Sequence, residues 1–287
     1  MCHSEPSLGG EESRINRKHA PAIIMSNDPL LLESLGNGLL RRTVHFFLDC
    51  PSTNEIIRKL ARSGEPEGAL AIADYQTAGR GRLCRAWQAP AGSSLLFSLL
   101  LRPPIPHSRA LQAAMAVSLG VIQGIRLDCG LTARLKWPND ILIGGRKAGG
   151  ILCELGLDGE RLDYVIVGVG LNVNFDPLGV AGIPPDSTSI LVELGRPRSR
   201  TALLRVILEE MEPLYRAVCR GESLRAEWAR ALETLGLYVR VELPEEEITG
   251  KAESVDENGA LILRLRNRSQ RTILAGDVVH VTIDDKP

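Results

Sequence analysis

The segment Gly79–Trp87 carries the most distinctive chemistry in the chain, because it places Arg80, Arg82 and Arg85 beside flexible glycines. Glycine lets a backbone approach a ligand closely, and the forked guanidinium donors suit phosphate oxygens. Since the like charges repel one another, we predict an open, mobile loop that becomes ordered when a polyphosphate or an adenylate binds. A solvated basic loop without a ligand explains this segment equally well on its own.

Two lysines near strand ends could also meet anions. Lys136 begins the segment KWPND, in which Asp140 could hold Mg²⁺ through oxygen. Lys147 lies in the segment GRKAGGIL, where the small residues that follow leave room for a flat ligand against the backbone. Taken singly, each segment has a simpler structural explanation: a strand end with an Asn-Asp turn, and a hairpin with a surface lysine.

Two further segments give weaker signals. Residues Gly168–Asn174 read GVGLNVN, which is not the Rossmann form because no third glycine follows to open a helix. The run Ser52-Thr53-Asn54 offers two hydroxyls and an amide that could bind a ureido group. A helix cap is the simpler local explanation of that run, so neither segment identifies a ligand by itself.

The elements that must position these segments include both strands and helices. Periodicity and turn signals predict strands at 44–48, 69–74, 94–101, 133–137, 140–143, 147–155 and 164–174. They predict helices at 28–38, 52–61, 109–127, 201–220 and 223–235. Ser52 and Glu55 give a capping-box signal, and Gly144-Gly145 predicts a tight hairpin. After Gly236, short alternating runs indicate a small barrel-like β-module. We therefore predict an α+β fold, a mixed and mainly antiparallel sheet with helices packed on it.

Composition excludes several classes of protein. The 287 residues carry a formal net charge of −1, which argues against a general polyanion binder. Six cysteines are scattered without a CxxC pair, so we predict reduced thiols in a cytoplasmic protein, not a zinc site or a disulfide framework. We expect no apolar run of the roughly 18 residues that a membrane span needs. Residues 1–26 are polar and do not have the pattern of a signal peptide.

Together, in this order and at these spacings, the five segments resemble biotin protein ligases. The most specific parts are the GRGR loop followed by Trp87, and KWPND followed by RKAGGIL. The likeness runs from about Asp49 to the C-terminus. It implies a class II synthetase-like catalytic fold with a small C-terminal SH3-like β-barrel. The implied domains are a leader at 1–38, a catalytic biotin- and ATP-binding domain at 39–236 and the barrel at 237–287.

The resemblance also implies a reaction, in which biotin and ATP form biotinyl-5′-AMP with Mg²⁺ and the biotinyl group then moves to a lysine of a biotin carboxyl carrier domain. Two anions must meet in the first step, so cations are needed there. The residues expected to carry this chemistry are Arg82, Lys147 and Lys136. The biotin site is expected to comprise Ser52, Thr53, Asn54, Gln76, Gly79, Arg80, Arg82, Trp87, Lys147, Gly150, Gly168 and Gly170. The nucleotide site is expected to comprise Arg82, Arg85, Lys136, Asn139 and Asn172, with Asp140 as the Mg²⁺ ligand.

Two alternatives remain at this point. One is a lipoate ligase or octanoyl transferase on the related fold, and the other is a biotin-sensing regulator without ligase activity. Only about 43 residues precede the first catalytic strand, fewer than the roughly 60 of a winged helix-turn-helix, so we expect no sequence-specific DNA binding. We expect no membrane association, and either a monomer or a homodimer. We assign no catalytic residue to the C-terminal β-module.

Overall fold

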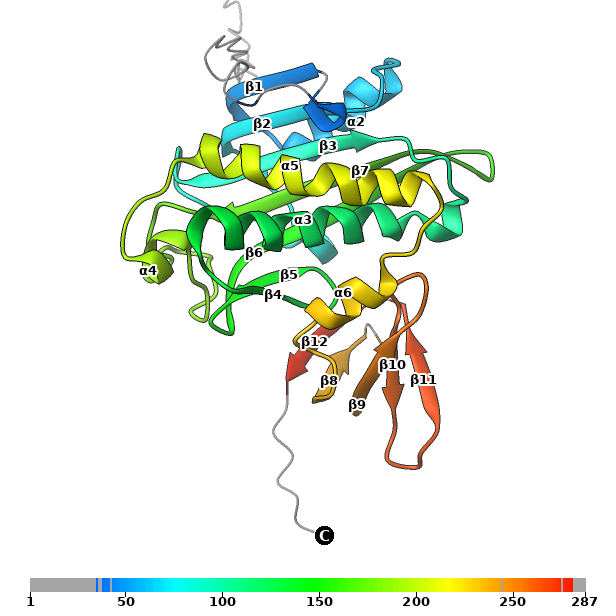
Figure 1. Ribbon diagram of the computed structural model, residues 1–287. Helices are drawn as coiled ribbons and strands as arrows, with labels where there is room; N and C mark the ends of the chain where they lie inside the picture. The colour runs from blue at the N-terminus through cyan, green and yellow to red at the C-terminus, as the bar shows by residue number, and fades with distance from the viewer. Residues whose placement is uncertain (1–34, 36–37, 42, 244, 275, 281–287) are drawn as a thin grey trace, which may run out of the picture.

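A seven-stranded sheet forms the centre of the computed structural model, which describes residues 35, 38–41, 43–243, 245–274 and 276–280 (Figure 1). The strand order is β1-β2-β3-β7-β6-β5-β4. Strands β1 and β2 pair in parallel and the other neighbours are antiparallel, which confirms the predicted mixed, mainly antiparallel sheet. Its strands are β1 (Thr43–Cys50), β2 (Ala69–Gln76), β3 (Ser94–Leu101), β4 (Ala133–Lys136), β5 (Asp140–Ile143), β6 (Arg146–Asp158) and β7 (Arg161–Asn172).

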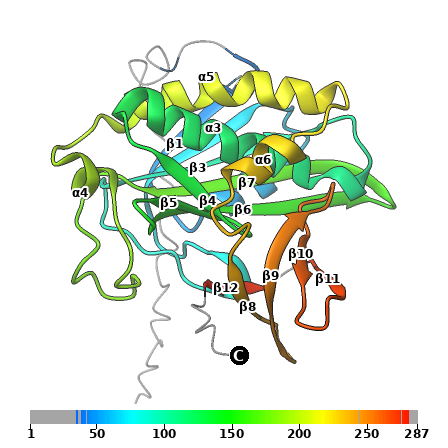
Figure 2. The ribbon, with the colours of Figure 1, turned by 60° about the horizontal axis from the view of Figure 1, so that its bottom comes forward.

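The two faces of this sheet are covered differently, as Figures 1 and 2 show. Alternation along β2 turns Leu70 and Ile72 into the core beneath α3 and α5, and turns Ala71 and Ala73 toward α2. Helix α2 covers only one end of the second face, which leaves the rest of that face for a site. The helices are α2 (Thr53–Arg62), α3 (Leu111–Cys129), α4 (Ile190–Leu194), α5 (Arg200–Cys219) and α6 (Arg225–Ala231), with 3₁₀ turns η1 (Leu39–Arg41), η2 (Arg82–Cys84) and η3 (His107–Arg109).

A second, five-stranded antiparallel sheet follows α6 in the order β11-β10-β9-β8-β12. The indole N–H of Trp137 donates to the carbonyl of Gly259 over 2.8 Å, and the side-chain amide of Gln112 donates to the carbonyl of Glu257 over 2.7 Å. These bonds tie the second sheet to the turn after β4 and to α3. Its strands are β8 (Tyr238–Glu242), β9 (Glu247–Val255), β10 (Leu261–Arg264), β11 (Gln270–Ile273) and β12 (Asp277–His280).

Local structure agrees with the predicted elements in most places and differs in a few. Gly144 and Gly145 both have positive φ, 58° and 75°, which confirms the tight hairpin between β5 and β6. The predicted capping box is wrong, because the Ser52 side chain makes no capping bond and Glu55 pairs with Lys59 at 2.8 Å. Helix α4 was not predicted, and α6 is shorter than the helix expected at 223–235. The expected helix at 28–38 and the leader at 1–26 lie outside the described residues, apart from residues 35 and 38.

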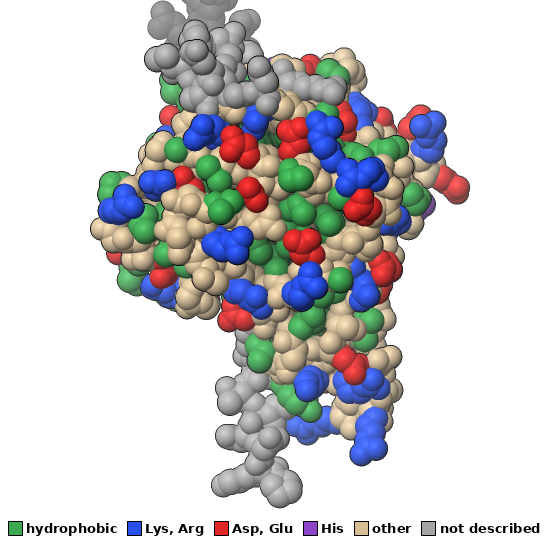
Figure 3. Space-filling model, in the orientation of Figure 1, with side chains coloured by type: hydrophobic (Ala, Val, Ile, Leu, Met, Phe, Trp, Pro, Cys, Tyr) green, Lys and Arg blue, Asp and Glu red, His purple; other side chains and the backbone are tan. Residues whose placement is uncertain are grey.

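The core helix corrects one expectation from composition. Residues His107–Cys129 are long and apolar enough to cross a membrane by length and composition, although no such run was expected. In the structure 67% of that apolar window is buried, because α3 packs on the sheet and side by side with α5 (Figure 1). Figure 3 shows positive and negative side chains interspersed over the α3 and α5 face. Burial in a protein core therefore explains the hydropathy of this helix.

Candidate active site

A cavity of about 610 Å³ lies on the sheet face that α3 and α5 leave free. Gly168 and Gly170 alternate in phase with Ile166, which packs on the α2 side, so these glycines face the cavity. Gly79, which was predicted to be part of the biotin site, is not a lining residue. The other predicted residues all line the cavity: Ser52, Thr53, Asn54, Gln76, Arg80, Arg82, Arg85, Trp87, Lys136, Asn139, Asp140, Lys147, Gly150, Gly168, Gly170 and Asn172.

One end of the cavity is formed by the start of α2 and the end of β2. The main-chain N–H of Thr53 donates to Oε1 of Gln76 over 2.7 Å. Gln76 therefore satisfies an unpaired amide at the helix start, a function that the sequence suggested for Ser52. Ser52 and Thr53 are 8% and 4% exposed. Hydroxyl and amide groups thus meet in a nearly water-free corner, where hydrogen bonds to a polar ligand are strong.

The small residues of β7 make room for the protein's own side chains. A Cβ atom on Gly168 would lie 2.0 Å from Oδ1 of Asn54, and one on Gly170 would lie 2.6 Å from the indole of Trp87. In this structure Asn54 and Trp87 occupy the space beside Gly168 and Gly170. At Gly150, one of the small residues after Lys147 where a flat ligand was predicted, a Cβ atom would meet its neighbours only at 3.7 Å or more.

Gly79 acts on the cavity indirectly. The main-chain N–H of Trp87 donates to the carbonyl of Gly79 over 2.9 Å, which closes the base of the loop. A Cβ atom on Gly79 would meet the carbonyl oxygen of Trp87 at 2.7 Å, so only glycine fits where these two backbone segments pass close to each other. Gly79 thereby positions Trp87 without lining the cavity.

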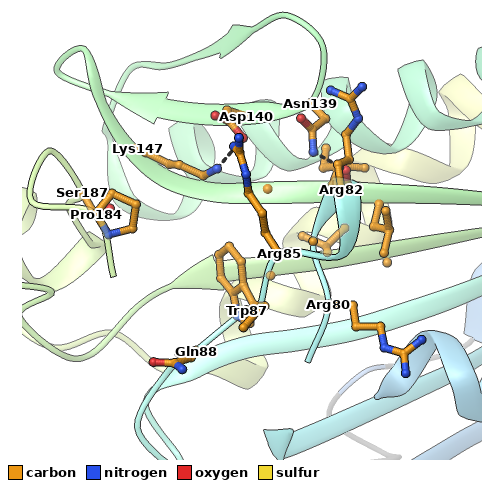
Figure 4. Close-up of a pocket in the computed structure, with 18 of the residues that line it drawn as sticks. Arg80, Arg82, Arg85, Trp87, Gln88, Asn139, Asp140, Lys147, Pro184 and Ser187 are labelled. Atoms are coloured by element: carbon orange, nitrogen blue, oxygen red, sulfur yellow. Dashed lines mark hydrogen bonds and ion pairs between the residues drawn. The ribbon is translucent and has the colours of Figure 1, made fainter. Parts of the chain in front are cut away.

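The other end of the cavity gathers cations (Figure 4). Nζ of Lys147 lies 2.6 Å from Oδ1 of Asp140, and the guanidinium of Arg82 donates to the carbonyl of Gly276 over 3.2 Å. Arg85 pairs with Asp277 of β12. Burial lowers the pKa of Arg82, and the nearby Asp277 and Asp140 partly offset this effect. An arginine stays protonated under such a shift, so the cavity holds positive charge that an anionic ligand could neutralise.

Arg80 does not join this cationic end. Figure 4 shows its side chain turned away from Lys147 and Asp140, on the opposite side of the loop from Arg82. Its exposed guanidinium lines the part of the cavity nearer to α2. The three arginines of the loop are thus divided between the two ends of the cavity.

Two asparagines predicted for the nucleotide side differ in their free groups. The side-chain amide of Asn139 donates to the carbonyl of Ile151 over 2.8 Å, which joins the turn before β5 to β6. That of Asn172 donates to the carbonyl of Thr188 over 3.0 Å, while its buried Oδ1 has no partner among the described residues. A buried acceptor without a partner is costly, so Asn172 Oδ1 is a suitable acceptor for a ligand N–H group.

The sequence did not indicate several lining residues. Glu242, Asp277 and Val279 come from the C-terminal sheet, to which no site residue had been assigned. The loop before α4 contributes Gly182, Ile183, Pro184 and Ser187. The main-chain N–H and the carbonyl of Lys147 both hydrogen-bond to the backbone of this loop. No local motif marks these residues, since they meet the site only through tertiary contacts.

The donor set bears on metal binding and on thiol chemistry. The described part of the chain has no cluster of three or more His, Cys, Asp or Glu side chains that could hold a metal ion. Mg²⁺ commonly binds one or two carboxylates together with substrate phosphates, and Asp140 fits that smaller requirement. Burial raises the pKa of Cys50 and of Cys153 to about 12, so neither thiol is a nucleophile at neutral pH.

Comparison with known proteins decides the family. A family model for the Biotin/lipoate A/B protein ligase family matches residues 48–172, a description that covers two kinds of ligase. A second family model, Biotin protein ligase C terminal domain, matches residues 234–281. A biotin–[acetyl-CoA-carboxylase] ligase of Mycobacterium tuberculosis is 34% identical over 256 residues, covering 86% of this chain and 92% of that protein. The chain belongs to the biotin protein ligase family.

Other similar proteins agree with this membership. The bifunctional ligase/repressor BirA of Bacillus subtilis is 35% identical over 230 residues, covering 79% of this chain and 70% of that protein. A solved structure described as biotin protein ligase from Aquifex aeolicus in complex with biotin and ATP has a TM-score of 0.69 and 27% identity, covering 83% of this chain and 98% of that one. The predicted family, fold class and ligase activity are therefore confirmed.

Proposed function

We propose that the chain condenses biotin with ATP to biotinyl-5′-AMP and then transfers the biotinyl group to a lysine of a biotin carboxyl carrier domain. The observation that carries this proposal is a single cavity with two unlike ends. One end has the buried hydroxyl and amide groups of Thr53 and Gln76, and the other has the cations Arg82 and Lys147. A polar heterocycle with an acidic tail fits the first end, and a polyphosphate fits the second.

Adenylation requires the biotin carboxylate to attack the α-phosphorus of ATP, with pyrophosphate leaving. In this structure Lys147 is paired with Asp140 at 2.6 Å. We propose that the biotin carboxylate takes the place of Asp140 beside Lys147, while Arg82 faces both the carboxylate and the α-phosphate. The two cations offset the repulsion between the reacting anions and hold them in position for attack.

Mg²⁺ is proposed on the same grounds. Once Lys147 turns to the biotin carboxylate, Asp140 becomes free to hold the ion together with phosphate oxygens, and the ion would neutralise charge on the departing pyrophosphate. Arg85 and Lys136 line the same side and would contact the phosphates. Asn172 would accept a hydrogen bond from the nucleotide through its unpartnered Oδ1.

Transfer then joins the acceptor lysine amine to the acyl carbon, and AMP leaves. The reaction needs the mixed anhydride to be shielded from water until the amine arrives, and the Gly79–Trp87 loop lies over the cavity where it can provide that shield. The expected acceptor is a folded carrier domain. The thiols of Cys50, Cys129, Cys153 and Cys219 are free, which fits a cytoplasmic enzyme.

A pyrophosphate-exchange assay tests the proposal. The chain is incubated with ATP, Mg²⁺ and labelled pyrophosphate, and with biotin or lipoate in parallel. We expect label to enter ATP with biotin and not with lipoate, and we expect biotin to appear on a purified carrier domain. Exchange with lipoate alone would favour the lipoate ligase alternative, and tight biotin binding without exchange would favour a biotin-sensing regulator.

A further inference from the structure

A row of polar side chains lies behind the α2 end of the cavity, and it begins at the half-buried Glu154 on β6. Its carboxylate pairs with Arg58 of α2 and accepts a hydrogen bond from the side-chain amide of Asn54 over 3.2 Å. The carbonyl of Leu152 lies at the same end of that amide, 3.5 Å from Nδ2. Both neighbours can only accept, so reversing the amide of Asn54 would set oxygen against oxygen. The charge on Glu154 therefore fixes Oδ1 of Asn54 toward Ser98.

Ser98 occupies the next position in the row. Its hydroxyl oxygen lies 2.6 Å from Oδ1 of Asn54 and 2.7 Å from Oγ1 of Thr53. A hydroxyl has one proton, and the amide oxygen can only accept, so Ser98 donates to Asn54. Oγ1 of Thr53 lies 2.7 Å from the Ser98 hydroxyl and 3.1 Å from Oε1 of Gln76, which already accepts the main-chain N–H of Thr53. The shorter contact, between the two hydroxyl oxygens, therefore takes the Thr53 proton. Thr53, Asn54 and Ser98 are 4%, 5% and 0% exposed, so water does not offer alternative partners.

The row ends at the cavity wall. Because Thr53 donates its proton to Ser98, only lone pairs of its Oγ1 remain for a ligand. Oε1 of Gln76 accepts the main-chain N–H of Thr53 over 2.7 Å, so the opposite, donating end of that amide is left for a ligand. The wall thus offers one fixed acceptor beside one fixed donor, and a cyclic urea offers the complementary ring N–H and carbonyl oxygen.

We propose that Ser98 and Glu154 are positioning residues that fix Thr53 as an acceptor and thereby set the preference of the site for a cyclic urea. The inference rests on the proposed function, because biotin carries that ring. Neither residue needs to touch biotin: Ser98 acts through Thr53, and Glu154 acts through Asn54 and Ser98. An analogue in which a ring oxygen replaces the N–H that faces Thr53 should fit this wall less well, since two acceptors would then face each other.

The test compares Ser98→Ala and Glu154→Gln with the wild-type chain, by biotin-dependent pyrophosphate exchange and by the same assay with a cyclic carbamate analogue of biotin, in which a ring oxygen replaces the N–H that faces Thr53. Ser94→Ala is the matched control, because Ser94 is a fully buried serine on the same strand whose hydroxyl has no partner among the described residues. For Ser98→Ala we expect the KM for biotin to rise about tenfold, the loss of one buried hydrogen bond. The KM for ATP and the kcat at saturating biotin should change little.

Discrimination between the two ligands separates positioning from a general structural role. We expect Ser98→Ala to weaken biotin more than the carbamate analogue, because only biotin offers Thr53 a ring N–H to accept. The ratio of their kcat/KM values should therefore narrow, and Glu154→Gln should act in the same direction with a smaller effect. Equal losses for both ligands, or no change while wild type exchanges normally, would overturn the inference alone. If Ser98→Ala does not fold, Glu154→Gln decides. No exchange by wild type would instead reject the proposed function, and the inference with it.

Discussion

Gly168→Ala should both destabilise the chain and weaken biotin binding. The added Cβ atom would lie 2.0 Å from Oδ1 of Asn54, 2.9 Å from its Cγ and 3.2 Å from Oγ of Ser98. Asn54 must therefore retreat by more than about 1 Å to reach an ordinary contact distance. Hydrogen bonds to Ser98 and Glu154 hold it on both sides, so it cannot retreat without breaking at least one of them.

The cost can be set from these contacts. Leaving a buried acceptor unsatisfied costs about 1–3 kcal/mol, and overpacking a core position costs about 1–3 kcal/mol more. We expect a loss of about 3 kcal/mol in the free energy of unfolding, which lowers Tm by about 6–12 °C in a chain of this size class. Thr53 is the first residue of α2 and precedes Asn54, so a displaced Asn54 also disturbs Thr53 on the cavity wall. The KM for biotin should therefore rise about tenfold or more.

The assay pairs thermal unfolding with biotin-dependent pyrophosphate exchange. Gly150→Ala is the matched control for stability, because a Cβ atom there meets Trp87 and Asp140 at ordinary distances of 3.7 and 3.8 Å. Its Tm should stay within about 2 °C of wild type. A Gly168→Ala variant that unfolds at the wild-type temperature and keeps the wild-type KM would refute the view that Asn54 is held rigidly over β7.

Three further changes have defined outcomes. Lys147→Ala should lower kcat for adenylation about 10²–10³-fold, because one cation facing the reacting acids is lost; an unchanged kcat would remove Lys147 from the mechanism. Asp277→Asn should lower the KM for ATP by up to about fivefold, since Arg85 no longer has to leave a carboxylate, with a change in stability below about 1 kcal/mol; a raised KM would contradict this. Hydrogen bonds from Arg198 lower the pKa of Asp128, so this pair stabilises the fold above the unfolded-state pKa of Asp128 and is lost as pH falls through the lower folded-state value. The unfolding free-energy difference between wild type and Asp128→Asn should be constant above about pH 5 and shrink below about pH 4; a difference that grows on acidification would reverse the assignment.

Elements with strong periodicity could be predicted from the sequence. Strand β3 has the predicted bounds, Ser94–Leu101, because a run that is apolar except for Ser94 and Ser98 is buried on both faces of the sheet. The Gly144-Gly145 hairpin follows from turn chemistry alone. Helix α4, with five residues, is too short to give a periodic signal, and the capping box is absent because Glu55 pairs with Lys59 instead of reaching back to Ser52. Local sequence signals therefore failed where another side chain took the partner that the predicted contact required.

The candidate site shows the same division. Motif order and spacing placed Arg82, Lys147 and Asp140 in one cavity, but could not show that Lys147 and Asp140 neutralise each other. Asp277 was missed because it lies 192 residues from Arg85 in the chain and meets it only through the second sheet. The sequence showed a glycine at position 168, but it could not show that the side chain of Asn54 fills the space beside that glycine. The individual residue roles and the domain boundary near residue 236 stay predictions.

A crystal structure of the chain with biotinyl-5′-AMP tests most directly whether the two cations neutralise the reacting acids. We predict that Nζ of Lys147 leaves Asp140 and lies within hydrogen-bond distance of the acyl or phosphoryl oxygens, with the guanidinium of Arg82 over the phosphate. A complex in which Lys147 still pairs with Asp140 at 2.6 Å while the ligand's mixed anhydride lies elsewhere would contradict the account.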